Sequence, residues 1–254
     1  VLHSSSPCLI ILAIYLTCTL LVDPRGEFPL NDDWSYSRSA FKLGTVGQLQ
    51  IDEWSAPNLV GQALYGGLLA RAFGASFLVL RMSTIVLSCM AACLLWALFR
   101  RLKAGYALSW IAVLAWIFNP LWFCLSFSYM TEVPFLFFIL LALFLYLLHL
   151  QGGRLWSLTA CGAVLGYAFL IRQTSVLFMA PVFVVLALSC IRDKTRHRFL
   201  RMLLWTAAAG GFIAGFWLWS QQQGGSTPAA QRKFELLAKI TSPQILGNSF
   251  GILF

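Results

Sequence analysis

Long apolar runs alternate with short polar segments along almost the whole of this chain. The runs occupy about residues 8–22, 77–99, 106–123, 133–150, 156–171, 176–191 and 202–219. Runs of this length cross a bilayer as single helices, the first one only with help from its flanks. A cleaved signal peptide is the alternative for the first run, but it lacks a basic leading region and a clear cleavage site. The pattern predicts an all-α, polytopic transmembrane bundle of about seven spans.

The polar segment from residue 23 to 77 is the long exception to this pattern. Ser35 to Leu43 has Tyr36 and Ala40 at helical spacing and predicts a short helix that lies along the membrane surface. Residues 57–73 are moderately apolar with interrupting glycines, and predict a second juxtamembrane helix. A connection this long in so apolar a chain is typical of a functional loop.

Composition supports a membrane protein and narrows its partners. Of 254 residues, 59% are hydrophobic and 11% charged, and the mean hydropathy is +0.78. The formal net charge is +9, but the basic residues gather between apolar runs, at 100–103 and 192–201, as in cytoplasmic loops. No basic, aromatic surface points to nucleic acid. The seven cysteines are scattered singly, and we interpret them as small buried hydrophobic residues.

Orientation follows from the two basic clusters. If both are cytoplasmic, the N-terminus is inside, and residues 23–77, 119–132 and 172–175 are outside. Three unusual charge sites then share the outer side: the pair Asp32 and Asp33, Glu132, and Arg172. The three histidines fall on the opposite side, which leaves no histidine-based metal site beside the acidic loop: His3, His149 and His197.

Each of these charges also has a purely structural interpretation. Asp32 and Asp33 could form a solvated turn or a helix cap. Glu132, between Thr131 as a cap and an early proline, could merely complement a helix dipole. Arg172 interrupts an apolar stretch near the outer face, where it could extend to lipid headgroups or pair with an acid. Their shared side favours a site for an anionic, lipid-borne substrate.

Four motifs in register resemble one family. Asp32-Asp33-x-x-Tyr36, with Ala40 and Gly44 behind it, resembles the first-loop motif of GT-C membrane glycosyltransferases, of the dolichyl-phosphate-mannose protein mannosyltransferase and aminoarabinose transferase type. The other three matches, in chain order, are Arg81-Met82-Ser83 through Arg100-Arg101-Leu102, Asn119-Pro120 through Thr131-Glu132-Val133-Pro134, and Gly166 through Arg172. Together they cover about residues 8–190.

The resemblance implies transfer of a sugar from a polyprenyl-phosphate carrier at the extracytoplasmic face of the cell membrane. Asp32 aligns with the catalytic acid, and Asp33 stands where the family usually has Glu. Residues 23–77 would be the catalytic loop of a single membrane-embedded domain, 1–254. At Ser55-Ala56-Pro57 the chain lacks an acidic-basic-Pro motif of the aminoarabinose transferases, which leaves a divalent metal and the acceptor open.

The residue types suit this chemistry. Inverting transfer needs one carboxylate to take the acceptor's proton, and cationic groups to stabilise the departing phosphate. Asp32 fits the base and Arg172 the phosphate clamp, with Tyr36, Glu132 and Arg81 as further substrate-binding candidates. The competing classes are a secondary transporter, in which Glu132 and Arg172 form a coupling pair, and a non-enzymatic membrane subunit. The apolar run at 250–254 predicts that the protein continues beyond this sequence.

Overall fold

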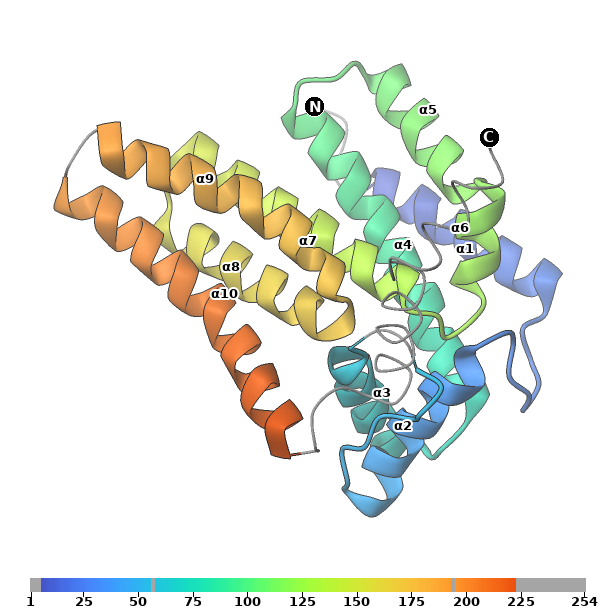
Figure 1. The fold of residues 1–254 in the computed structure, drawn as a ribbon. Coiled ribbons are helices and arrows are strands. Elements are labelled where there is room, and N and C mark those ends of the chain that lie inside the picture. Colours follow the sequence, from blue (N-terminus) through green and yellow to red (C-terminus); the bar gives the residue numbers. More distant parts are fainter. Residues whose placement is uncertain (1–5, 56–57, 193–194, 223–254) are drawn as a thin grey trace, which may run out of the picture.

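The computed structural model describes residues 6–55, 58–192 and 195–222, which form an all-helical bundle (Figure 1). The helices are α1 (Ser6–Val22), α2 (Asp33–Val46), α3 (Val60–Phe73), α4 (Phe77–Arg101), α5 (Tyr106–Ile117), α6 (Pro120–Ser126), α7 (Glu132–Gly152), α8 (Leu155–Ile171), the short 3₁₀ helix η1 (Gln173–Ser175), α9 (Val176–Arg192) and α10 (Arg196–Gln222). The predicted all-α fold is confirmed, as are the two short helices of the first loop.

The prediction of about seven membrane spans is supported in part. Within the described residues, four helical segments are long and apolar enough to cross a membrane: α4, α7, α10, and η1 with α9. A fifth results if α5 and α6, which are bent by 63° to one another, count as one span. The bend arises because Asn119 caps α6 through Leu121 and Trp122, and Pro120 cannot continue α5. Helices α1 and α8, of 17 residues each, are apolar but shorter.

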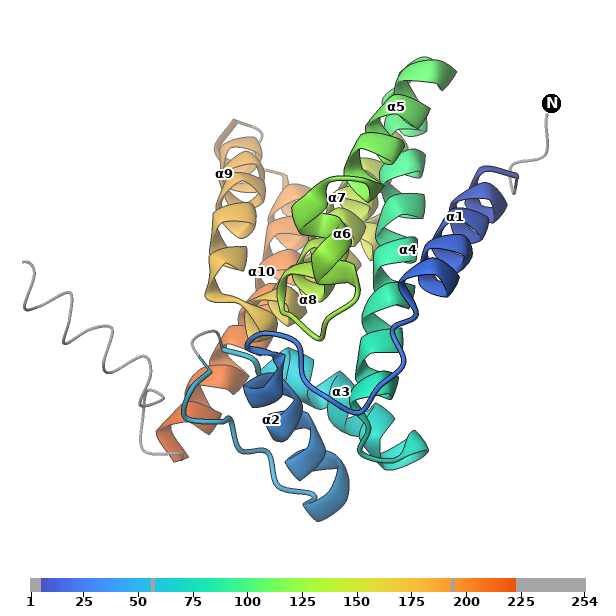
Figure 2. The ribbon, with the colours of Figure 1, turned by 90° about the vertical axis from the view of Figure 1, so that its right-hand side faces the viewer.

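The two ends of the bundle differ in character. Helices α2 and α3 lie at one end, and the last turn of α4, the end of α9 and the start of α10 lie at the other (Figure 2). The second end therefore carries both basic clusters, together with His149 and His197. This arrangement agrees with the predicted orientation, in which the first loop and the basic clusters are on opposite sides.

Small residues let α2 cross α3 closely. A side chain at Gly44 would meet the Ala70 side chain at 2.7 Å and the Gly67 carbonyl oxygen at 2.8 Å. A glycine also lets α8 pack closely against α10, because a Cβ atom at Gly162 would lie 2.7 Å from the Trp205 carbonyl oxygen. The close packing predicted for the small residues of 156–171 is confirmed. Separate hydrogen bonds, from the Asn58 side chain to the Phe169 carbonyl oxygen and from the Tyr167 hydroxyl to the Gly61 carbonyl oxygen, hold the end of α8 against the first loop.

The prediction that the cysteines are buried needs correction. All seven cysteines are free, but only Cys161 is buried, whereas Cys8 and Cys124 are exposed. A thiol on the outer surface of an apolar helix suits contact with lipid, so burial within the protein is unnecessary. The features that lie outside the described residues are His3, Ala56, Pro57 and the apolar run 250–254.

Candidate active site

Asp33 is committed to the backbone of two loops. It is the first residue of α2 and is 2% exposed. Its Oδ1 accepts the Leu30 N–H at 2.6 Å, and its Oδ2 accepts the Tyr129 N–H at 3.2 Å. Burial raises the pKa of Asp33, against the opposing effect of these two bonds and of Arg81. Oδ1 thus holds a turn within the first loop, and Oδ2 joins this loop to the segment before α7; in this structure Asp33 acts as a structural carboxylate.

Asp32 is the opposite case. It occupies the N-cap position of α2, yet its side chain makes no cap hydrogen bond. The residue is exposed, and its carboxylate has no hydrogen-bond partner among the described residues. The capping interpretation therefore does not account for Asp32. Its carboxylate stands at the N-terminal end of α2, and its oxygens are open to a ligand.

Glu132 and Arg172 form an ion pair, 40 residues apart in sequence. Arg172 follows the last turn of α8, and Glu132 opens α7. Arg172 Nη1 donates to Glu132 Oε1 at 2.6 Å, with about a third of each side chain exposed. Thr131 was predicted to cap α7 but makes no cap bond; its hydroxyl instead donates to Glu132 Oε2 at 3.5 Å. Arg172 thus has a carboxylate partner, as expected for a charge at this depth.

Tyr36 links Asp32 to this pair. Its side chain is 7% exposed and lies one helical turn beyond Asp32 on α2. Burial raises the pKa of Tyr36 to about 12; the negative charges of Glu132 and Asp32 add to this increase, and Arg172 opposes it. The phenol therefore lies within the electrostatic reach of all three groups. The structure brings together residues from the first loop, the start of α7 and the end of α8.

The family model described as dolichyl-phosphate-mannose-protein mannosyltransferase matches residues 63–219. The chain belongs to this family. It is accordingly a membrane protein of a glycosyltransferase family, as the motifs and apolar helices predict. No curated protein and no solved structure matches the chain. The matched range contains Arg81, Glu132 and Arg172, whereas Asp32, Asp33 and Tyr36 precede it.

Arg81 holds the mannosyltransferase-like chain's first loop in place. It is 1% exposed near the start of α4 and donates to the Pro24 carbonyl oxygen through Nη1 and, at 2.8 Å, to the Phe28 carbonyl oxygen through Nη2. Its guanidinium carbon also lies 5.2 Å from the centre of the Phe28 ring. These contacts hold residues 24–28 against the start of α4; the substrate contact suggested for Arg81 by the sequence stays a prediction.

Tyr129 is a positioning residue that the sequence did not single out. Its hydroxyl donates to the Gln62 carbonyl oxygen at 2.7 Å, and the Gln62 side-chain amide donates back to the Tyr129 carbonyl oxygen at 2.9 Å. Its own N–H binds Asp33. This buried network ties α2, α3 and the segment before α7 into one unit. The partners are at least 67 residues apart, so no local sequence signal points to this network.

Apart from Asp32, the acids of this site are engaged by other groups of the protein. Among the residues that the structure describes, no group of three His, Cys, Asp or Glu side chains could hold a metal ion. Each oxygen of Asp33 accepts one backbone N–H group. Glu132 is likewise engaged, by Arg172 and Thr131.

Proposed function

We propose that the protein transfers a sugar from a polyprenyl-phosphate carrier to a hydroxyl group of a lipid, glycan or protein acceptor, at the extracytoplasmic face. The observation that carries this proposal is the ion pair of Arg172 and Glu132, which lies within electrostatic reach of Tyr36 together with the open carboxylate of Asp32. A cation, a base and a phenol thus meet at one end of an apolar bundle. A lipid carrier would reach this end from the bilayer with its phosphate at the surface.

Asp32 is the proposed general base. The acceptor oxygen forms a bond to the anomeric carbon while the bond from that carbon to the phosphate oxygen breaks, and the configuration inverts. The acceptor's proton passes to Asp32, and the electron pair of the broken bond leaves with the polyprenyl phosphate. Because a phosphate is a good leaving group, one base suffices and no general acid is needed. The exposed, unbonded carboxylate of Asp32 meets this requirement, whereas Asp33 does not.

Arg172 is the proposed phosphate ligand. Its Nη1 is held by Glu132, and the other N–H groups of the guanidinium have no partner among the described residues, so they can donate to phosphate oxygens. Glu132 fixes the direction of the guanidinium. A cation held in this way stabilises the charge that develops on the departing phosphate without having to reorganise. Tyr36, whose raised pKa keeps the phenol protonated, would donate a hydrogen bond to the substrate.

The proposal is tested by removing the base and keeping its shape. Asp32→Asn should lower sugar transfer from a polyprenyl-phosphate-mannose donor by about two to four orders of magnitude, with unchanged expression. Asp23→Asn is the matched control, because Asp23 is an exposed acid of the same loop whose described partner is Arg25. It should leave transfer unchanged. Wild-type activity in Asp32→Asn would refute the assignment of Asp32 as the base.

A further inference from the structure

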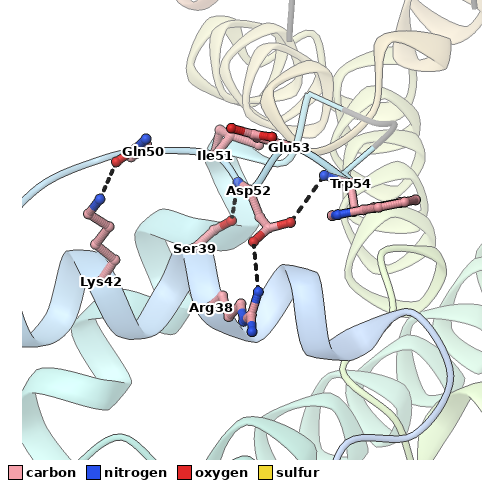
Figure 3. Close-up of a pocket in the computed structure, with 8 residues that line it drawn as sticks. All are labelled: Arg38, Ser39, Lys42, Gln50, Ile51, Asp52, Glu53 and Trp54. Atoms are coloured by element: carbon pink, nitrogen blue, oxygen red, sulfur yellow. Dashed lines mark hydrogen bonds and ion pairs between the residues drawn. The ribbon is translucent and has the colours of Figure 1, made fainter. Parts of the chain in front are cut away.

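A polar pocket lies between α2 and the loop that follows it, separate from the charged pair. Its volume is about 480 Å³. The residues that line it are Arg38, Ser39, Lys42, Gln50, Ile51, Asp52, Glu53 and Trp54 (Figure 3). Ser39 fixes the loop onto the helix, since its hydroxyl oxygen accepts the Asp52 N–H at 3.0 Å. The pocket is therefore a built feature of the first loop, and none of the roles proposed above uses it.

The charges around this pocket are balanced. Nη1 of Arg38 lies 3.8 Å from Oδ2 of Asp52, and Lys42 donates to the side-chain oxygen of Gln50 (Figure 3). With Glu53, the lining holds two cations and two carboxylates. An anionic ligand would meet the repulsion of both carboxylates, and a lipid tail would leave these polar groups without water. A neutral ligand rich in hydroxyl groups can both donate to the carboxylates and accept from the cations.

The indole ring of Trp54 borders the same pocket, and that of Trp34 lies beside it. Trp54 is 66% exposed, which is unusual for so large an apolar side chain in a polar loop. Its ring lies 6.5 Å from that of Trp34, and the Arg38 guanidinium lies 5.0 Å from the centre of the Trp34 ring. Exposed aromatic faces beside hydrogen-bonding groups suit a ligand that has an apolar face and polar edges. A pyranose ring has this character.

We propose that this pocket binds a neutral saccharide unit of the acceptor. The inference rests on the proposed transfer reaction and adds to it a class of acceptor. The pocket residue Ser39 lies seven residues beyond Asp32 on α2, about two helical turns, so the two positions share one face of the helix and are separated by roughly 10 Å along its axis. A glycan seated against Trp54 can therefore extend along α2 and present its next sugar to Asp32.

Direct binding tests this proposal without any transfer step. The purified protein, in a detergent without a sugar headgroup, is titrated with neutral trisaccharides of mannose, glucose and galactose, and saturation-transfer NMR reports binding. At least one trisaccharide should bind saturably to the wild type. Trp54→Ala should weaken that binding about fivefold or more, and Trp54→Phe should restore part of it. Trp54 is exposed, so the protein should tolerate these changes.

The control separates this site from the catalytic one. Asp32→Asn should bind the trisaccharide as the wild type does while it loses transfer. Absence of binding by all three trisaccharides, or equal binding by Trp54→Ala, would overturn the saccharide site and leave the role of Asp32 intact. Trp54-dependent binding of a Ser/Thr-rich peptide or of inorganic phosphate instead would also overturn it, in favour of a protein or an anionic acceptor.

Discussion

At the scale of single residues, Asp32 and Asp33 show how neighbours in sequence take opposite roles. The turn at Asn31, with a φ of 57°, directs Asp33 inward to two backbone N–H groups and leaves Asp32 at the surface. The sequence predicted that an acid would act here but could not tell which one is buried. That choice depends on Tyr129, which lies 96 residues away.

Asp33 should make the protein's stability depend on pH. Its pKa is raised in the folded state, so the folded protein keeps a proton that the unfolded chain has already lost. Stability therefore falls as the pH rises from about 4 through the raised pKa. We expect the melting temperature of the wild type, relative to Asp33→Asn, to fall across this window. A difference that rises with pH would show that the two N–H bonds outweigh burial.

At the scale of elements, the apolar periodicity of the sequence predicts where helices begin and end, but it does not predict how they contact one another. The two short helices of the first loop and most helix boundaries agree with the predictions, because each depends on local composition. The break between α5 and α6 was missed, since the span predicted over 106–123 ran through Asn119-Pro120. The bonds that join α3 to Tyr129 could not be predicted, because they connect residues far apart that nothing in the local pattern relates.

Gly66 tests the packing of α3 against this network. A methyl group here would lie 2.0 Å from the Tyr129 hydroxyl and 2.9 Å from the Ala40 side chain. Gly66→Ala should break the Tyr129–Gln62 bond and destabilise the protein by about 1–3 kcal/mol. In the control, Gly210→Ala in α10, nothing lies within 4 Å of the new methyl group, so stability should hold or rise. Equal melting temperatures for the two variants would refute this role of the network.

At the scale of the whole molecule, the site lies at one end of the bundle. Figure 2 shows α2 and α3 at the end opposite the last turn of α4 and the start of α10. A coupling pair in a secondary transporter is expected near the middle of the membrane. The partly exposed pair of Glu132 and Arg172 therefore suits chemistry at a surface better than transport. The contacts that a lipid carrier or an acceptor makes beyond this ion pair cannot be predicted from the sequence pattern.

The side of the membrane on which the first loop lies can be tested by labelling. Single cysteines at Gln48 and Thr195, in a cysteine-free background, should differ in labelling by an impermeant thiol reagent on intact cells. Both positions are exposed, whereas Ser37 in the same loop is fully buried and unsuitable. We expect labelling at 48 and none at 195. Labelling at 195 alone would reverse the orientation and place the site on the cytoplasmic side.

Arg172 offers the most direct test of a site built for a phosphate-linked donor. The measurement is the transfer rate against polyprenyl-phosphate-sugar concentration, at matched amounts of folded protein, for wild type, Arg172→Lys and Arg172→Ala. Arg25→Ala, which removes an exposed arginine of the first loop, is the control and should match the wild type.

The account predicts a strong loss of donor use in Arg172→Ala and partial activity in Arg172→Lys, because lysine keeps the charge but not the guanidinium fork. A membrane-surface anchor would tolerate lysine fully and lose only stability with alanine. An Arg172→Ala rate equal to wild type at every donor concentration would contradict the central claim, and the phosphate would then need another partner.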